Sequence, residues 1–278
     1  MVDLAEKALR EVPLVVLDVE TTGLLPALGH RVVEVAAIRL EQWHEVGQLN
    51  QLLNPGRPMD LGASRVNGIR DVDLVGAPPF SAIAADLEAL LEGALVVAHN
   101  ARFDAGFLSA EYGCLIPARP PLPNPWLCTL QLARRLFHFR RNNLGHVVRH
   151  FGLRSSRAHR ALNDATMTAE ILKRMVAQLV SRHPYHDNVG TLLQAQGGPI
   201  YMPPPARPRL PAALQQALAR RTPVRILYVS RGRKTRRVIS PLYATEHNGN
   251  IYLVAYCHLR QAQRTFRLDR IAGAEPAE

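Results

Sequence analysis

Hydrophobic positions along the first 180 residues predict a sheet covered by helices. A continuous apolar run over 12–17 is typical of a buried strand, and alternating stretches over 31–41 and 45–55 predict a hairpin. Another short apolar strand is predicted over 94–100. Helices are predicted over 78–93, 101–113, 128–137, 143–152 and 160–180. Strands followed by mixed strands and helices indicate an α/β layered domain over residues 1–182.

The pattern changes after residue 181. Residues 183–208 are rich in Pro and Gly and are predicted to be a partly stiff linker. Residues 209–278 predict a small all-β domain that begins with one helix. That helix is expected over 212–221 and four short strands over 223–230, 236–245, 249–258 and 263–271.

Composition narrows the class of protein. The chain has 278 residues and is 47% hydrophobic, which is enough for two buried cores. No apolar run approaches the roughly 20 residues that cross a bilayer, so no membrane contact is expected. The cysteines Cys114, Cys128 and Cys257 show neither disulfide nor metal spacing. These features predict a soluble protein of a reducing bacterial cytoplasm.

Positive charge is concentrated at the C-terminal end. From Ala206 onward there are 14 Lys and Arg residues against four Asp and Glu, a net charge of +10, whereas the first 205 residues carry +1. With only three lysines, the chain prefers Arg, but this preference does not explain the local shortage of acids. The asymmetry predicts nucleic acid as a polyanionic partner of the C-terminal domain.

A pair of like charges follows the first predicted strand. Side chains two apart on a strand point to the same face, so Asp18 and Glu20 project together. Away from water they would repel each other, and one would take up a proton. A divalent cation resolves this conflict, and carboxylate oxygens suit Mg²⁺ or Mn²⁺. The alternative is a strand end with both acids in water.

Two further acids and one histidine strengthen this prediction. Asp104 lies in the first turns of the helix after the strand at 94–100, where sites assemble in α/β folds, although an acid near a helix N-terminus is also favourable by itself. Asp164 lies early in the last long helix, at the end that its apolar neighbours place against the domain. His159 lies five residues before Asp164, so the two converge only if His159 sits on the loop before the helix.

Four carboxylates and one histidine fit a two-metal hydrolysis site. Two cations about 3.5–4 Å apart stabilise the attacking and leaving oxygens of a displacement at phosphorus, and a neutral His takes a proton from water. No nucleophilic Cys or Ser arrangement and no Gly-rich phosphate loop competes. The sequence therefore predicts two Mg²⁺ or Mn²⁺ ions held by Asp18, Glu20, Asp104 and Asp164, beside His159.

Three short segments carry a family resemblance. DVETTG, HNARFD and HRALND resemble, in order, the three motifs of the DEDDh (DnaQ-like) 3′→5′ exonucleases, a family that includes the proofreading subunit of bacterial replicative polymerase. The resemblance covers roughly residues 13–180. It implies a ribonuclease H-like three-layer fold with a mixed central sheet. By position it implies that Asp18 bridges the two ions, that Asp104 supports the second, and that His159 is the general base.

The resemblance also implies contacts with the terminal nucleotide of the substrate. Leu24 is expected to wedge against its base. Asn67 stands where the family often has His, so altered contact rather than lost activity is expected. The full set of expected contacts is Thr21, Thr22, Gly23, Leu24, Asn67, His99, Asn100 and Phe103.

The C-terminal segment resembles a WYL domain, a small Sm-like β-barrel seen as a ligand-sensing or nucleic-acid-binding module in bacterial regulators. Ile251 replaces the Trp of the name-giving triplet, whereas Tyr and Leu remain. Tyr252 is expected to stack on bases, and Arg side chains can bind phosphate through two hydrogen bonds. The alternative for these arginines is ordinary pairing with the adjacent Asp269. The expected nucleic-acid contacts are Tyr252, Arg264, Arg267 and Arg270.

Together these features predict a metal-dependent 3′→5′ exonuclease that releases nucleoside 5′-monophosphates from single-stranded DNA. DNA repair or proofreading is the expected setting, with a polymerase or other DNA-repair proteins as partners. One alternative is an exoribonuclease acting on RNA or short oligoribonucleotides. A second is a WYL-type nucleic-acid-binding regulator with residual nuclease, which the intact set of acids and the lack of a convincing helix-turn-helix motif disfavour. The sequence does not fix the oligomeric state.

Overall fold

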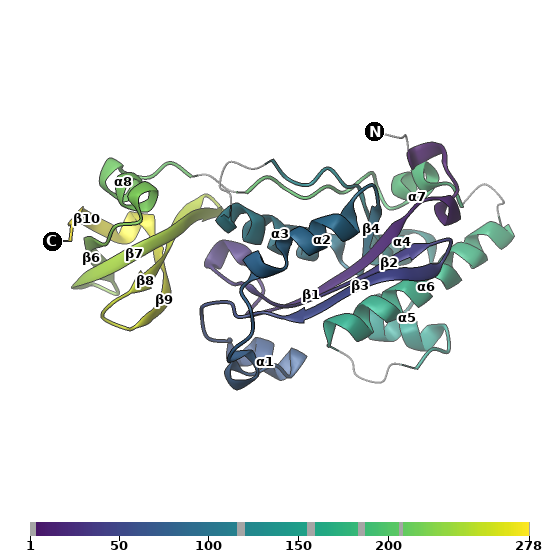
Figure 1. Ribbon diagram of the computed structural model, residues 1–278, viewed down its shortest axis with the longest axis horizontal. Helices are drawn as coiled ribbons and strands as arrows, with labels where there is room; N and C mark the ends of the chain where they lie inside the picture. The colour runs from purple at the N-terminus through teal and green to yellow at the C-terminus, as the bar shows by residue number, and fades with distance from the viewer. Residues whose placement is uncertain (1–3, 116–119, 155–158, 183–186, 206–207, 278) are drawn as a thin grey trace.

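A five-stranded mixed sheet forms the centre of the first domain (Figure 1). The computed structural model describes residues 4–115, 120–154, 159–182, 187–205 and 208–277. The strands of the first sheet are β1 (Leu14–Thr21), β2 (Val32–Glu41), β3 (His44–Leu52), β4 (Leu95–Ala98) and β5 (Trp126–Cys128). Their order is β3–β2–β1–β4–β5, in which β2 is antiparallel to β1 and β3, β4 is parallel to β1, and β5 is parallel to β4. The predicted mixed sheet is confirmed.

Helices cover both faces of this sheet. Leu14 and Val16 of β1 point to one face and Val15 and Leu17 to the other, because side chains alternate along a strand. The first face packs against α4 (Thr129–Leu136), α5 (Leu144–His150), α6 (Ala161–Arg182) and α7 (Val189–Ala195). The second face packs against α2 (Ala84–Leu91) and α3 (Ala101–Leu115). The α/β layering is confirmed. Among the described helices, none combines the length and apolar content that a membrane span requires.

Local structure departs from the predicted ranges where prolines or very short elements intervene. The helix expected over 78–93 is a 3-10 turn, η5 (Phe80–Ala82), followed by α2, because Pro79 holds the backbone extended before the turn. The sequence did not predict β5 or the seven-residue helix α1 (Leu61–Asn67). Further 3-10 turns among the described residues of this domain include η1 (Leu4–Glu6), η2 (Leu9–Glu11), η3 (Pro26–Leu28) and η4 (Asp71–Leu74).

Much of the stretch predicted as a linker, 183–208, packs onto the first domain. Leu192 of α7 is buried in the same core as α6. Ile200 forms a β-bridge with Trp126 and is 5% exposed. The side-chain amide of Gln196 donates to the carbonyl of Trp126 at 2.8 Å. A seven-residue helix and a single bridge leave little periodic signal, which is why the sequence alone did not reveal this packing.

The second domain is an antiparallel sheet packed against one helix. Its elements are α8 (Ala212–Arg220), β6 (Val224–Ser230), β7 (Arg233–His247), β8 (Asn250–Cys257), β9 (Ala262–Arg267), η7 (Leu268–Arg270) and β10 (Ile271–Pro276). Leu214 of α8 packs with Ile226, Leu253 and Phe266 in a separate core. The strand order is β10–β6–β7–β8–β9, and in the part of the chain that the structure describes no pairing joins β9 to β10. The structure therefore shows the strands of the predicted Sm-like barrel as a five-stranded antiparallel sheet, and among the described residues the sheet is not closed into a barrel.

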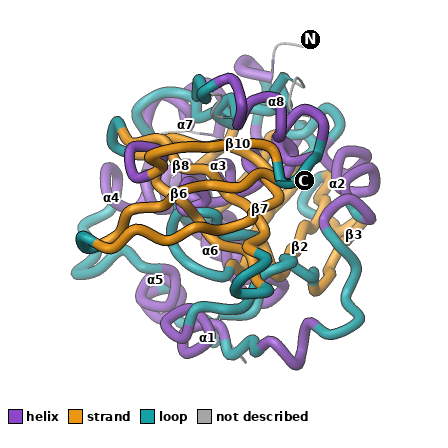
Figure 2. The backbone as a smooth tube through the Cα atoms, turned by 90° about the vertical axis from the view of Figure 1, so that its left-hand side faces the viewer, coloured by secondary structure: helices purple, strands orange, loops and turns teal. Residues whose placement is uncertain are grey.

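The opposite face of this second sheet contacts the first domain, which lies behind the sheet in the view of Figure 2. Tyr243, Val254 and Thr265 share that face, because Val254 is the register partner of both others. Val254 is buried, and the Thr265 hydroxyl donates to the carbonyl of Leu28 in η3 at 2.8 Å. Gly29 follows with a φ of +83°, and a Cβ there would lie 2.8 Å from the Thr265 hydroxyl. The junction therefore requires glycine for both its backbone conformation and its size.

Candidate active site

Two acids lie near the end of β1, on the face of the sheet that α6 covers. Asp18 and Glu20 continue the side of the strand that begins with Leu14 and Val16. Val16 is the last residue of β1 that pairs with β4, so the acids lie where that neighbouring strand no longer flanks β1.

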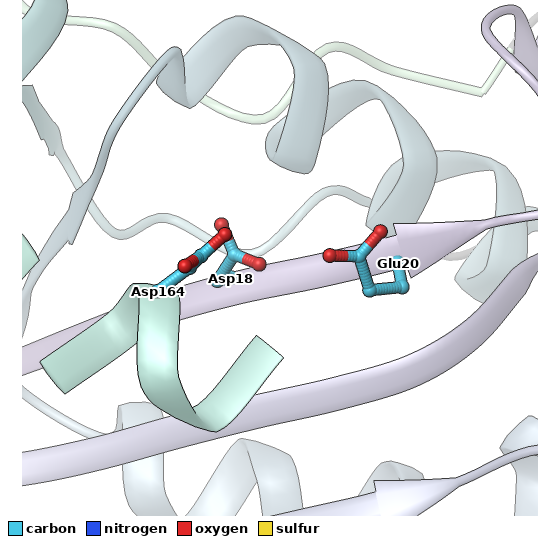
Figure 3. A group of neighbouring side chains, drawn as sticks. All are labelled: Asp18, Glu20 and Asp164. Atoms are coloured by element: carbon cyan, nitrogen blue, oxygen red, sulfur yellow. The ribbon is translucent and has the colours of Figure 1, made fainter. Parts of the chain in front are cut away.

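A third carboxylate comes from α6. Asp164 lies in the first turn of this helix, and oxygen atoms of Asp18, Glu20 and Asp164 lie within 4.8 Å of one another. Figure 3 shows the carboxylates of Asp18 and Asp164 side by side, with Glu20 further along the strand. The fold thus gathers acids from segments far apart in the sequence.

Asp104 approaches β1 from α3. Its Oδ1 accepts a hydrogen bond from the backbone N–H of Val19 at 3.2 Å, beyond the last pairing of β1 with β4. The residue is 2% exposed, and among the described residues its Oδ2 has no hydrogen-bond partner. A buried, unpartnered carboxylate oxygen is costly, so a cation or a proton is needed to stabilise it.

Burial raises the pKa of every carboxyl in this group. Desolvation is the largest cause for Asp18, Glu20 and Asp164, and neighbouring carboxylates raise these pKa values further. The pKa of Glu20 rises to about 7. Burial also raises the pKa of Asp104, against the opposing effect of the hydrogen bond from Val19. When these carboxylates are ionised they repel one another, so a bound cation or a proton would stabilise the site.

The donor set fits a divalent cation. The clustered side chains offer only carboxylate oxygens, which suit Mg²⁺ or Mn²⁺ rather than softer metals. The unpartnered Oδ2 of Asp104 is a further oxygen available to an ion or to an ion-bound water. Asp18, Glu20, Asp104 and Asp164 are therefore the residues that could hold metal.

His159 lies on the loop before α6, which begins at Ala161. Its backbone N–H donates to Oδ2 of Asp164 at 3.1 Å, and the residue is exposed. Its φ of +62° is uncommon for a residue other than glycine. The position beside Asp164 is the one required for the two to converge, and the role of general base stays a prediction.

An ion pair that the sequence did not reveal fixes this end of α6. Glu34 of β2 is the register partner of Glu20 and is 2% exposed. Its carboxylate accepts hydrogen bonds from the guanidinium of Arg160, the shortest at 2.7 Å, and from the backbone N–H of Ala161 at 3.1 Å. Because Arg160 directly follows His159, the pair ties β2 to the loop and helix that carry two site residues. The only sequence signal was one acid within an apolar stretch, residues 32–38.

The residues after Glu20 form a turn held by internal hydrogen bonds. The Thr21 hydroxyl donates to the carbonyl of Gly23 at 2.6 Å, and the Thr22 hydroxyl lies 3.1 Å from Nδ1 of His30. A Cβ on Gly23 would lie 2.3 Å from Cε1 of His30, so the imidazole packs directly on the glycine backbone. Leu24 is 78% exposed, as a side chain available to a substrate base must be. Contact of this turn with a nucleotide stays a prediction.

Asn67 is directed toward the acidic strand. It is 5% exposed, and its amide donates to the carbonyl of Thr21 at 3.3 Å and accepts from the backbone N–H of Ile69 at 3.0 Å. Its hydrogen bond to Glu20 lowers the pKa of that acid, against the larger effect of burial. Asn67 thus supports the acidic strand, and its predicted contact with the terminal nucleotide is untested.

In the second motif, the side chain of His99 makes its hydrogen bonds within the protein. Both ring nitrogens of His99 have partners at 2.9 Å, the Thr129 hydroxyl and the carbonyl of Asn142, and burial lowers the pKa of His99 to about 4. His99 is therefore a neutral group that joins the end of β4 to α4. Asn100 is exposed and Phe103 half-buried. Substrate contact by these three residues stays a prediction.

The C-terminal residues predicted to bind nucleic acid differ in their surroundings. Arg267 is held by Asp269 through two hydrogen bonds of 2.7 and 2.5 Å, so the alternative Arg–Asp pairing is present at this arginine. Tyr252 is the register partner of Arg267. Arg264 and Arg270 are exposed. Contacts of all four with nucleic acid stay predictions.

The layered fold and its acidic site are those of an α/β exonuclease, and comparisons with known proteins agree. Residues 15–172 match the exonuclease family of the RNase T type, and residues 209–276 match the WYL domain. Because the first match covers more than half of the chain, the protein belongs to this exonuclease family. The two resemblances inferred from the motifs, including the enzyme class they imply, are confirmed.

Similar curated proteins are much longer than this chain. It is 32% identical over 176 residues to the PolC-type DNA polymerase III of Streptococcus thermophilus and 31% identical over 183 residues to that of Streptococcus pneumoniae. These matches cover 63% and 66% of this chain but only 12% of each relative. The similarity is therefore to one region of those polymerases.

Solved structures share the fold. Exonuclease X, in complex with 5′ overhanging duplex DNA, has a TM-score of 0.50 and 24% identity over 66% of this chain and 99% of its own. Exonuclease I has a TM-score of 0.56 and 16% identity over 95% of this chain and 64% of its own. The E. coli Exonuclease I complex with a dT13 oligonucleotide has a TM-score of 0.53 and 17% identity over 96% of this chain and 66% of its own. The Exonuclease I matches thus extend over the C-terminal domain.

Proposed function

We propose that the protein is a metal-dependent 3′→5′ exonuclease that releases nucleoside 5′-monophosphates from single-stranded DNA. The observation that carries the proposal is the gathering of Asp18, Glu20 and Asp164 within 4.8 Å, beside Asp104 with its unpartnered oxygen. Like charges in this arrangement need cations. Membership of the exonuclease family supplies the reaction class.

Each side chain has a role in the proposed reaction. Asp18, Glu20 and Asp164 would hold a first Mg²⁺ or Mn²⁺, and Asp18 and Asp104 a second. Two such ions, when bound, stabilise the attacking and leaving oxygens at phosphorus. His159, exposed on its loop, takes the proton from the attacking water. Glu34 and Arg160 keep that loop and Asp164 in place.

The choice of single-stranded DNA rests on the C-terminal domain. The hairpin joining β6 and β7 exposes Arg231, Arg233, Lys234 and Arg236, and no ion pair is recorded for them within the described ranges. Unpaired cations on a surface attract phosphates. Exonuclease I, whose structural match includes this domain, has been solved with dT13 and discussed in terms of processivity. We infer that the WYL domain, as an Sm-like barrel, holds the strand.

The setting follows from the same similarities. The relatives are bacterial PolC-type polymerases, which supports proofreading or repair in a bacterial cytoplasm, with a polymerase or another repair protein as a partner. Co-purification of the tagged protein with a replicative polymerase tests this association. Recovery of the tagged protein without any replication or repair protein would argue against it.

The activity is tested on 5′-labelled single strands of matched DNA and RNA, with and without Mg²⁺ or Mn²⁺. The expected result is shortening from the 3′ end that needs the cation and is faster on DNA. Asp18→Asn should abolish it, whereas Asp86→Asn, at an exposed acid on α2, should not. Shortening from the 5′ end, or full activity of Asp18→Asn, would overturn the proposal. Faster cleavage of RNA would favour an exoribonuclease.

A further inference from the structure

An open cleft lies at the domain junction. Its volume is about 370 Å³, within the range of ligand sites. The first domain contributes residues 54–58, Asp71, Leu74 and Val75, and the second contributes Tyr256 and residues 261–263. Arg57 and Gln263, one from each wall, donate to the same carbonyl, that of Gly29, at 2.5 and 3.3 Å. The cleft is therefore built around the contact that joins the domains.

One wall of the cleft presents a fixed aromatic ring. Tyr256 is 39% exposed, and the ring of His258 packs edge-on against it, with centroids 5.3 Å apart and planes at 86°. His258 is itself held by the Ser240 hydroxyl at 2.9 Å. Gln263 is the register partner of Tyr256, so its amide stands beside the ring on the same face. A flat ring flanked by a hydrogen-bonding amide suits a nucleobase.

The other wall combines an apolar surface with a guanidinium. Val75 is 81% exposed at the cleft. The Arg57 side chain is 15% exposed, and its contact with Asp60 is long, at 3.7 Å. Its Nε is buried without a hydrogen-bond partner among the described residues. The guanidinium thus contributes positive charge to this wall, which favours a phosphate in the cleft.

The position of the cleft points to a strand of nucleic acid rather than to a free metabolite. β1 runs toward the C-terminal domain, and only the turn over 21–28 separates Glu20 from Gly29 (Figure 1). A strand whose 3′ end lies at the acids and whose upstream part lies on the basic domain must cross the junction. The cleft is open to solvent, which allows a continuous chain to pass.

We propose that the junction cleft binds one upstream nucleotide of the substrate strand, with its base stacked on Tyr256. This rests on the proposed function, because the occupant belongs to the strand whose 3′ end is in the active site. The same chemistry would also accept a free nucleotide, and the experiment separates the two sources.

Binding is measured by fluorescence anisotropy with full-length Asp18→Asn protein, because this variant is expected not to cleave the labelled strand during the measurement. Labelled oligothymidylates are compared, a dinucleotide and a strand of about 16 nucleotides. Tyr256→Ala should weaken binding of the long strand about tenfold and leave the dinucleotide unchanged, as expected for one lost stacking contact. Tyr256→Phe, which keeps the ring, should bind within about twofold of the parent protein.

The controls separate stacking from domain docking. Thr265→Val removes the hydrogen bond to Leu28 outside the cleft and should not reproduce the tenfold loss. Equal losses for Thr265→Val and Tyr256→Ala, a loss already present with the dinucleotide, or no loss at all would overturn the proposal. So would Tyr256-dependent binding of free dTMP with higher affinity than the long strand. If the unmodified protein cleaves nothing but the length-dependent loss is seen, the proposed function fails and the cleft assignment stands.

Discussion

The two oxygens of Asp104 differ, since Oδ1 accepts a hydrogen bond from Val19 and Oδ2 is buried with no partner in the parts of the chain that the structure describes. Asp104→Asn keeps an oxygen for Val19 but removes the charge. We expect about a 10- to 100-fold loss of Mn²⁺ affinity or of exonuclease rate, and we expect the variant to remain folded. Calorimetric titration with Mn²⁺ and rates on labelled strands measure these quantities. Unchanged Mn²⁺ affinity would show that the unpartnered oxygen faces no ion.

The raised pKa of Glu20 makes the stability of the metal-free protein depend on pH. A folded-state pKa of about 7, against the ordinary 4.5, means that the folded protein holds the proton more tightly than the unfolded chain. The contribution of protonated Glu20 to the free energy of unfolding is complete below pH 4.5, the ordinary pKa, and is lost as the pH rises through about 7, the pKa in the folded protein. Mn²⁺ binds the ionised carboxylates, so it should raise the melting temperature more above pH 7 than near pH 5. Equal Mn²⁺ shifts in thermal melts at both pH values would contradict this.

Some site residues were predictable from sequence and others were not. Asp18, Glu20 and Asp164 belong to motifs whose spacing indicates shared chemistry. Glu34 and Arg160 lie 126 residues apart, in a relation that exists only after α6 has packed on β2. An acid within an apolar stretch of a strand predicts a partner but does not identify it.

Among the elements, α6 depends on this ion pair for its position. Arg160→Ala would leave the carboxylate of Glu34, 2% exposed, without its partner, which costs about 3–5 kcal/mol of unfolding free energy. Glu34→Gln should cost less, because the side chain of Arg160 is 39% exposed and can reach water. Chemical denaturation measures both. Arg225→Ala, which removes the exposed pair with Glu275, is the control and should cost about 1 kcal/mol or less. A larger cost for Glu34→Gln would contradict this account.

Long periodic stretches predicted their elements, whereas elements made by packing were missed. The hairpin β2–β3 and the helix α6 follow the sequence pattern. β7 extends beyond the predicted 236–245 at both ends, where polar and charged residues carry no apolar signal. Pro241 lies inside the predicted strand, where the register shifts toward Tyr243, a position at which a strand tolerates proline. β10 contains Gly273 and Pro276, which disfavour strands, and it forms through pairing with β6.

For the whole molecule, the packing of residues 187–205 places the C-terminal end of a stable exonuclease domain near Pro205 rather than near residue 182. A chain ending after Pro205 keeps α7, Ile200 and Met202 in place, whereas one ending near Val180 removes all three from the core. Each large core side chain removed costs about 2–5 kcal/mol. We expect the longer form to unfold cooperatively and the shorter to be strongly destabilised, as measured by denaturation. Equal stability of the two forms would contradict this boundary.

If the C-terminal domain contacts the substrate strand, it should increase the salt dependence of strand binding. If its exposed cations contact phosphates, the slope of log affinity against log salt should be steeper for the full chain than for the form ending after Pro205, by about 0.7 per contact with a single strand. Anisotropy at several salt concentrations gives the slopes. Identical slopes would mean that the β6–β7 hairpin does not contact the strand.

Gly29 gives the junction of the two domains an unusual dependence on a single carbon atom. A methyl group at this position would stand 2.8 Å from the hydroxyl of Thr265 and 3.2 Å from a methyl of Val254. Every side chain larger than hydrogen would thus act as a wedge between the catalytic half and the basic half. Neither half is free to change its surface here unless the other changes with it.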